Sequence, residues 1–278
     1  MILSYHPCFE ADKNVICAGR NPDDDDLALI QAADALILPQ GCYESLYQMA
    51  RGNCPNIFPD YDARFRYPGK IGQVRLFQET DVAHPKSLIC QTMKYFSYPG
   101  TTLPDKFPFD FPFVFKFDWG GEGDQVYLIK SLPDLQDTLK RAEDFERTGQ
   151  AGFIIQEYIP SKNRTLRVVV IGQQVISYWR IQKQQDIFGS GLAKGSVIET
   201  DCDPDLQEKA VILVKDFCKK TKINLAGFDV IFSLETKIKE PFFLEINYFF
   251  GRRGLGGSEW FYELLIKEIN RWIDNLCL

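Results

Sequence analysis

Three oxygen-bearing side chains lie in two apolar segments that are typical of the strands of one β-hairpin. The segments, "LAGFDVIFSL" and "PFFLEINYF", are joined by a polar turn centred near Lys237. A simple hairpin register then places Asp229 opposite Glu245, with Asn247 two residues further along on the same face. Carboxylate and amide oxygens are ligands that suit Mg²⁺, which bridges nucleotide phosphates. The sequence therefore predicts a metal site formed by Asp229, Glu245 and Asn247.

These side chains have a second interpretation, because a sheet with one wet face also alternates polar with apolar residues. The residues around Asp229 and Glu245 are mostly aliphatic and aromatic, which indicates burial. An unpaired acid is costly to bury. Burial therefore favours the metal site over the wet face.

Two arginines lie on the hairpin "RTLRVVVIGQQVISYWRI", which turns at Gly172-Gln173. This turn pairs Arg167 with Tyr178 and Thr165 with Arg180, so both arginines share one face of the sheet. Beside a cluster of acids and a metal, they could hold phosphate or carboxylate oxygens. A pair of solvated surface arginines explains the same spacing equally well.

Lys116 lies inside the apolar segment "FVFKF", and a glycine-rich loop from Trp119 to Asp124 follows it. A lysine in such a strand is seldom fully buried without a partner. Glycines expose backbone N–H groups to anions, so the lysine and the loop together predict a phosphate site. A tight turn beside a lysine that reaches solvent is the alternative. The chain has neither a Walker phosphate loop nor the glycine-loop-before-lysine order of protein kinases.

The elements that must position these groups mix helices with antiparallel hairpins. The first 65 residues read as a small α/β unit with strands "NVICA" and "ADALILPQG" and helices "DDLALIQAA" and "CYESLYQMARG". The acidic run 23–26 is expected to be a solvated loop and helix cap. The other predicted features are a helix opened by Pro68-Gly69, a connector rich in proline and phenylalanine at 99–112, a helix from Ser131 to Arg147, a buried strand "GFIIQEYI", a helix from Pro204 to Thr221, and a last helix after the glycine-rich loop 251–257. This mixture predicts the α+β class and not a single doubly wound sheet.

The composition is that of a globular protein and narrows the possible partners. The chain has 278 residues, is 45% hydrophobic and has a net charge of −6. This charge gives no general reason to bind nucleic acid or an anionic membrane, and no apolar segment is long enough to cross a bilayer. Eight scattered cysteines, without a C-x-x-C pair and with only two histidines, argue against structural zinc. With no signal peptide evident, we expect reduced cysteines and a cytoplasmic protein.

The order of these groups along the chain resembles the ATP-grasp superfamily. A lysine and glycine loop come first, then a Q-E-x-x strand, an arginine hairpin, an Asp, and Glu-x-Asn. Over roughly residues 30 to 257, the chain looks most like the ribosomal-protein glutamate ligase and glutathione synthetase branch. The resemblance implies two α+β lobes that clasp a nucleotide: a first lobe at 66–155 and a second at 156–278, preceded by a short α/β domain at 1–65.

The resemblance also implies roles for particular residues, with ATP and Mg²⁺ (or Mn²⁺) as cofactors. "GKIGQVRLFQE" is similar to the family's D-K helix, with Gly69 where the family has Asp. The implied phosphate-binding residues are Lys70, Lys116, Gly120, Gly121 and Gly123, and the implied adenine slot is Gln156, Glu157, Tyr158 and Ile159. Catalytic roles fall on Arg167, Arg180 and Lys194, and the metal ligands are again Asp229, Glu245 and Asn247.

The implied activity is that of an ATP-dependent carboxylate–amine ligase that works through an acyl-phosphate. Its small-molecule partners are a carboxylate and an amine, and the expected substrate class is an amino acid or small peptide. The alternatives are a non-catalytic, regulatory ATP-binding module and a phosphotransferase to a hydroxyl; a homo-oligomer is also compatible with the sequence. The chain departs from the family's pattern at Thr165, where the family has Asp, and at Gly189 and Gly191, where it has Arg and Asn. "YFFGRRG" stands where the family has S-P-G.

That last departure contains two arginines that begin where the metal strand ends. Arg252 and Arg253 lie between Gly251 and Gly254, which permit a sharp bend. The planar fork of arginine suits bidentate carboxylate binding, so one of them is predicted to hold a substrate carboxylate. Two solvated arginines, or an ion pair with Glu259, are the alternative.

Overall fold

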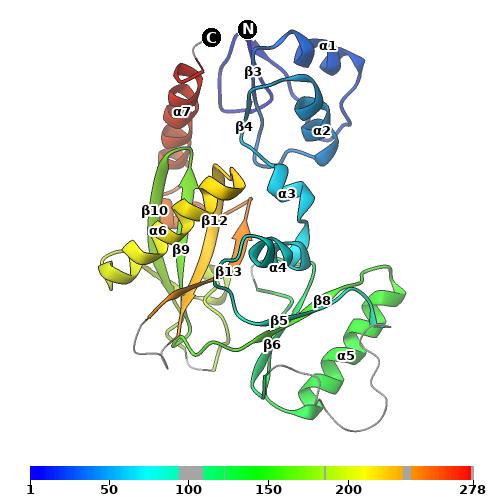
Figure 1. Cartoon of the computed structure of the whole chain (residues 1–278), viewed down its shortest axis with the longest axis vertical. Coiled ribbons are helices and arrows are strands. Elements are labelled where there is room, and N and C mark those ends of the chain that lie inside the picture. The colour runs from blue at the N-terminus through cyan, green and yellow to red at the C-terminus, as the bar shows by residue number, and fades with distance from the viewer. Residues whose placement is uncertain (94–108, 122, 185, 234–238, 277–278) are drawn as a thin grey trace.

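The computed structural model describes residues 1–93, 109–121, 123–184, 186–233 and 239–276, and these ranges form three β-sheets (Figure 1). The predicted turn near Lys237 and most of the predicted connector at 99–112 lie outside the described residues. None of the described helices is long and apolar enough to cross a membrane.

The N-terminal sheet is parallel and has the strand order β2-β1-β3-β4. Its strands are β1 (Ile2–Ser4), β2 (Lys13–Asn14), β3 (Ala35–Ile37) and β4 (Ile57–Phe58), with helices α1 (Asp24–Ala32) and α2 (Glu44–Asn53) between them. Both helices and the strand in "ADALILPQG" are confirmed. The strand over "NVICA" is wrong, since β2 ends at Asn14, and β1 was not predicted. Strands of two or three residues are too short to show a period and depend on parallel pairing with their neighbours.

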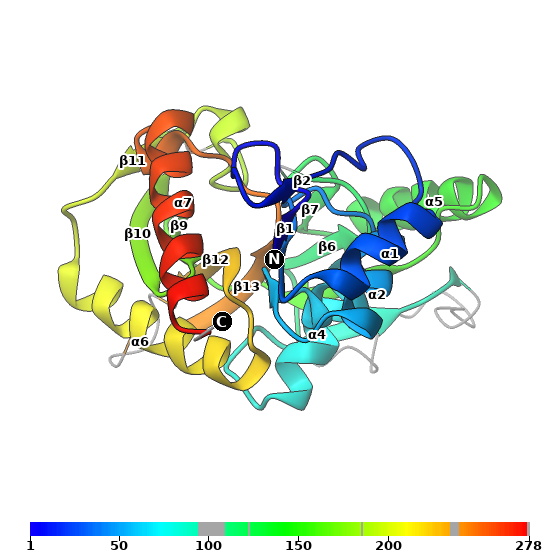
Figure 2. The same cartoon turned by 90° about the horizontal axis from the view of Figure 1, so that it is seen from above.

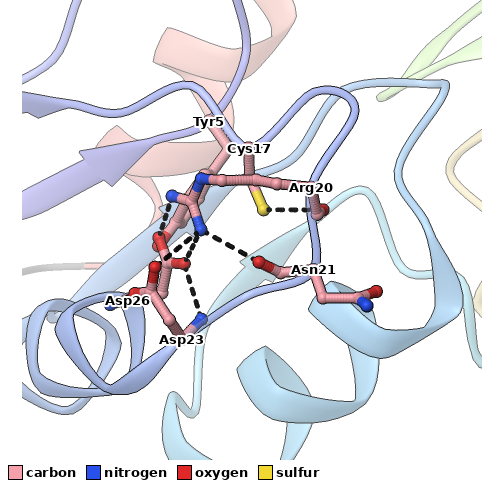
Figure 3. A network of polar contacts seen from close by, with 6 residues as sticks. All are labelled: Tyr5, Cys17, Arg20, Asn21, Asp23 and Asp26. Carbon is pink, nitrogen blue, oxygen red and sulfur yellow. Dashed lines mark hydrogen bonds and ion pairs between the residues drawn. The ribbon is translucent and has the colours of Figure 1, made fainter.

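The acidic run caps α1, as predicted, but it is not wholly solvated (Figure 3). Asp23 and Asp26 form a reciprocal capping box, and Asp26 is only 1% exposed. Both Asp26 oxygens are held by the Arg20 guanidinium, and the Tyr5 hydroxyl donates to one of them at 2.8 Å. The hydrogen bonds from Arg20 hold the pKa of the Asp26 carboxyl well below its usual range. A buried acid is tolerated here because its charge is paired and its oxygens are hydrogen-bonded.

The middle sheet is antiparallel, with the order β5-β8-β6-β7. Its strands are β5 (Ser87–Cys90), β6 (Phe113–Phe117), β7 (Val126–Ile129) and β8 (Phe153–Glu157). Helix α5 (Leu132–Arg147) packs on it, and Ser131 caps this helix by accepting from the Asp134 N–H, as predicted. Helices α3 (Asp62–Arg66) and α4 (Gly69–Glu79) connect this sheet with the N-terminal one.

The C-terminal sheet is also antiparallel and has the order β11-β10-β9-β12-β13. Its strands are β9 (Arg164–Ile171), β10 (Gln174–Ile181), β11 (Val197–Glu199), β12 (Leu225–Phe232) and β13 (Pro241–Asn247). Alternate residues of β9 face opposite sides: Val168 packs in the core with α6 (Pro204–Thr221), and Val169 packs in the core with α7 (Ser258–Asp274). Figure 2 shows this sheet and both helices on one side of the molecule, with the middle sheet and α5 on the other.

Separate helices with two antiparallel sheets confirm the α+β class. Both hairpin registers are confirmed as well: Arg167 pairs with Tyr178, and Asp229 pairs with Glu245. The lobe boundary predicted between residues 155 and 156 falls inside β8, which belongs to the middle sheet through Glu157.

Candidate active site

A cavity of about 440 Å³ is lined by residues from both the middle and the C-terminal sheets. From the predicted phosphate and adenine groups, it contains Lys116, Gly121, Gly123, Gln156, Glu157, Tyr158 and Ile159. From the predicted catalytic and metal groups, it contains Arg167, Arg180, Lys194, Asp229, Glu245 and Asn247. Lys70, Gly120, Arg252 and Arg253 do not line it. The structure therefore brings most of the predicted residues to one place.

Lys116 projects into this cavity from the centre of the middle sheet. It is 6% exposed, and burial lowers the pKa of its ammonium to about 8, although Glu245 favours the charged form. Among the described residues, the ammonium has no hydrogen bond or ion pair. A buried cation that faces a cavity without a partner is poised to bind an anion.

Lys70 lies behind the glycine loop and not in the cavity wall. Its ammonium donates to the carbonyl oxygens of Trp119 at 3.1 Å and Gly120 at 3.2 Å. Burial lowers its pKa, which Glu245 and Asp118 partly oppose. Lys70 thus fixes the start of the loop in this structure.

Gly69 stands where the ATP-grasp family has Asp, and the Asp118 carboxylate occupies the space beside it. Gly69 has φ +66°, and a Cβ there would lie 2.5 Å from the Asp118 Oδ1. The same oxygen accepts from the Ile71 N–H at 2.7 Å, which satisfies a free donor at the N-terminus of α4. Asp118, the residue after β6, therefore caps the helix that carries Lys70.

Lys194 holds the other end of the glycine loop from the opposite lobe. Its ammonium donates to the Gly123 carbonyl oxygen at 3.0 Å and to the Phe188 carbonyl oxygen at 3.4 Å. The Gln182 side chain donates to the backbone oxygen of Lys194 at 2.7 Å and steadies it. Two lysines, from two lobes, therefore hold carbonyl groups of one loop over the cavity.

A buried part of the cavity wall is a cluster of two arginines around Asp229. Arg167 donates to both Asp229 oxygens, from Nε at 2.6 Å and from a terminal nitrogen at 3.1 Å. Arg180 pairs with Asp229 at 2.5 Å and donates to the Thr165 hydroxyl at 3.1 Å. Burial opposes ionisation of Asp229, but the two arginines outweigh it and lower the pKa to about 2. Thr165, which stands where the family has Asp, thus accepts a hydrogen bond from Arg180.

The residues present fit a hard divalent cation, with Glu245 and Asn247 as the more available ligands. The Glu245 carboxylate has no hydrogen bond or ion pair within the described chain. Asn247 donates through its amide nitrogen to Asp229 at 3.3 Å, which leaves its carbonyl oxygen for a metal. The described residues contain no group of three His, Cys, Asp or Glu that could hold a metal, so the site depends on this amide oxygen.

The residues predicted to form the adenine slot lie at the end of β8, where Tyr158 and Ile159 line the cavity. The Gln156 side chain is buried and donates to the Ser87 hydroxyl at 2.9 Å. The Gln156 side chain is therefore not available to a ligand. The backbone groups after Glu157 are the ones that can hydrogen-bond a molecule in the cavity. Val114 and Leu244 supply apolar surface from the two facing sheets.

The structure gives no geometric support to a substrate role for Arg252 or Arg253. The Arg252 guanidinium lies over the rings of Phe261 and Tyr262, at 4.7 and 4.4 Å, and donates to the Ser258 hydroxyl at 3.4 Å. These cation–π contacts hold it on α7, and the loop contributes Gly251 to the cavity instead. The substrate role stays a prediction.

Sequence reasoning missed three residues around the cavity. Asp118 lies two residues after Lys116, and Gln73 lies one helical turn after Lys70; this spacing puts each near a predicted site residue but does not indicate the contact it makes. Phe249 lines the cavity while 71% exposed, and no pattern in the sequence separates it from the aromatic residues beside it.

Comparison with known proteins identifies the class. A sequence profile described as the RimK-like ATP-grasp domain matches residues 70–258, which is more than half of the chain. The chain therefore belongs to the RimK-like ATP-grasp family, and its fold is the ATP-grasp fold. An uncharacterized protein, the MG012 homolog of Mycoplasma pneumoniae, is 29% identical over 140 residues, which are 50% of this chain and 44% of that protein.

Solved structures show the same fold at low identity. D-alanine–D-alanine ligase from Bacillus anthracis, complexed with ATP, has a TM-score of 0.61 and 13% identity, covering 96% of this chain and 90% of its own. A RimK domain ATP-grasp protein from Sphaerobacter thermophilus has a TM-score of 0.56 and 12% identity, covering 96% and 98%. L-amino acid ligase from Bacillus licheniformis has a TM-score of 0.57 and 12% identity, covering 91% and 63%.

Proposed function

We propose that this protein is an ATP- and Mg²⁺-dependent ligase that joins a carboxylate to an amine. The observation that carries the proposal is a cavity lined by both the Lys116 ammonium and the Glu245 carboxylate, neither of which has a hydrogen bond or ion pair with another described residue. Such a pair can hold a polyanion together with a divalent cation. Two solved neighbours are named as ligases of amino acids, which makes an amino acid or small peptide the expected substrate class.

The residues of the two lobes divide the work. Lys116 and the glycine loop hold phosphate oxygens, and Lys70 keeps the loop in place. Arg180 and Arg167 place positive charge beside the oxygens on which negative charge develops during phosphoryl transfer to the carboxylate. ATP, when bound, would supply the phosphoryl group that activates the carboxylate, and Glu245, Asn247 and Asp229 would hold Mg²⁺, which would neutralise phosphate charge.

The base of the nucleotide has a fitting place at the end of β8. Backbone groups of residues 158 and 159 can hydrogen-bond its edge, while Val114 and Leu244 pack on its two faces. No nucleophilic side chain is needed, because the amine itself displaces phosphate from the activated carboxylate.

The test is ADP release by the purified protein with Mg²⁺ and ATP, in the presence of panels of amino acids and dipeptides. A ligase releases ADP and forms an amide only when both a carboxylate and an amine are present. Nucleotide binding without ADP release under any pair would favour the regulatory module. ADP release with a hydroxyl compound alone would favour the phosphotransferase.

A further inference from the structure

The strand with the metal-ligand candidates, β13, is an edge strand of the C-terminal sheet. Its outer side is bonded at Phe243, whose N–H donates to the Ala83 carbonyl oxygen at 2.8 Å, and at Ile246 by a side chain. Ile246 pairs with Phe228 on β12, and its own N–H and C=O are bonded on the other side by Gln73 of α4. The Ile246 N–H donates to Gln73 Oε1 at 2.8 Å, and Gln73 Nε2 donates to the Ile246 oxygen at 2.8 Å. At Ile246, one amide side chain therefore makes the two hydrogen bonds that a neighbouring strand would make.

Ile246 lies between the two metal-ligand candidates that have free oxygens. Its side chain is buried in the core, so Glu245 and Asn247, on either side of it, point to the opposite face and line the cavity. The register of β13 against β12 shifts between Asp229 and Val230, next to these residues. The bulge interrupts the pairing of β13 with β12, and the Gln73 amide adds a restraint on the outer side of the strand at Ile246, beyond the bond at Phe243.

Helix α4 connects this strand with the phosphate end of the cavity. Ile71 and Val74 pack against Ile154 of the middle sheet, whereas Phe77 stacks on Phe243 of β13 at 5.3 Å. Lys70, Gln73 and Phe77 are spaced along one stripe of the helix. The helix that fixes the glycine loop through Lys70 thus also fixes the metal strand through Gln73.

We propose that Gln73 is a positioning residue that couples the metal site to the phosphate site. The inference depends on the proposed nucleotide and Mg²⁺ binding and goes beyond it, because Gln73 lies outside the cavity. It holds Glu245 and Asn247 in register with the loop that Lys70 anchors. Loss of its two hydrogen bonds therefore reduces the gain in nucleotide affinity that Mg²⁺ provides, more than it reduces metal-free affinity.

The experiment is calorimetric titration with the non-hydrolysable analogue adenosine 5′-(β,γ-imido)triphosphate, with and without Mg²⁺. Gln73→Leu removes both hydrogen bonds, and Gln73→Glu keeps the acceptor but loses the donor. The matched control is Gln78→Leu on the same helix, since Gln78 is exposed. We expect Gln73→Leu to reduce the Mg²⁺ enhancement about tenfold, Gln73→Glu to reduce it about threefold, and Gln78→Leu to leave it unchanged.

The outcomes are distinguishable. An undiminished Mg²⁺ enhancement in Gln73→Leu overturns the inference, as does an equal loss of affinity with and without Mg²⁺, which is what a merely structural role gives. If Gln73→Leu does not fold, Gln73→Glu decides by the same comparison. Wild-type protein that does not bind the analogue overturns the proposed function, and the inference with it.

Discussion

Replacing Lys116 by methionine is expected to stabilise the nucleotide-free protein while weakening its binding of nucleotide. Burial lowers the pKa of Lys116 from 10.5 to about 8. Folding near neutral pH therefore desolvates an ammonium that has no partner in the described residues. A lowering of this size corresponds to about 3 kcal/mol of folding free energy. Methionine, which keeps a flexible apolar stem, recovers up to that amount and raises Tm by several degrees.

The pH dependence follows from the same pKa. The folded state holds the proton of Lys116 less tightly than the unfolded state does, so wild-type stability rises as pH increases from about 8 to about 10.5. The gain in free energy of unfolding that Lys116→Met provides is at its maximum below pH 8 and disappears between about pH 8 and about 10.5. Urea denaturation of both proteins between pH 7 and about 10 measures it. Lys130→Met, at an exposed lysine that follows β7, is the matched control and changes neither property.

The same substitution is expected to lower nucleotide affinity while it raises stability. Phosphate oxygens favour the charged ammonium, so Lys116→Met weakens binding of an ATP analogue about tenfold or more. Wild-type protein also takes up protons on binding near pH 8, which calorimetry in buffers of different ionisation enthalpy detects. A variant that is less stable than wild type, or that binds the analogue equally well, would refute the phosphate role of Lys116.

Two further predictions concern the groups on the other side of the cavity. Asp229→Asn leaves Arg167 and Arg180 buried without an anion, so urea denaturation should show a loss of about 3–5 kcal/mol; because the pKa of Asp229 is about 2, its contribution in wild type is present above about pH 4 and is lost as the pH falls through about 2. Lys194→Ala releases the Gly123 carbonyl, so hydrogen exchange should accelerate in the glycine loop and not in β8; equal exchange in both proteins would show that Lys194 does not hold the loop.

The parts of the site that the sequence predicted correctly are those set by local geometry. Each hairpin has its own turn and its own alternation of side chains, which fix the register within a few residues. Asp229 opposite Glu245 and Arg167 opposite Tyr178 follow from that rule. The register shift after Asp229 lies beyond the predicted pair and leaves the pairing of Asp229 with Glu245 intact.

The parts that the sequence could not predict are contacts between separate elements. The phosphate role of Lys70 stays a prediction, and the sequence did not indicate that its ammonium is bonded to loop carbonyls 49 and 50 residues away. The contact between Gln73 and Ile246 spans 173 residues. Neither contact has a local pattern, because the partners are backbone groups that every residue carries.

The charges of the cavity lead us to expect that the departures from the family's pattern affect acceptor choice more than nucleotide binding. In the described part of the chain, cations outnumber anions in the wall: Lys116, Arg164, Arg167, Arg180 and Lys194 face Glu157, Asp229 and Glu245. The whole protein is acidic, so this excess of positive charge is local and fits a polyanion bound with a cation. The departures at Thr165, Gly189 and Gly191 remove none of these charged groups. We therefore expect substitutions among them to change which acceptor is used before they change whether nucleotide binds.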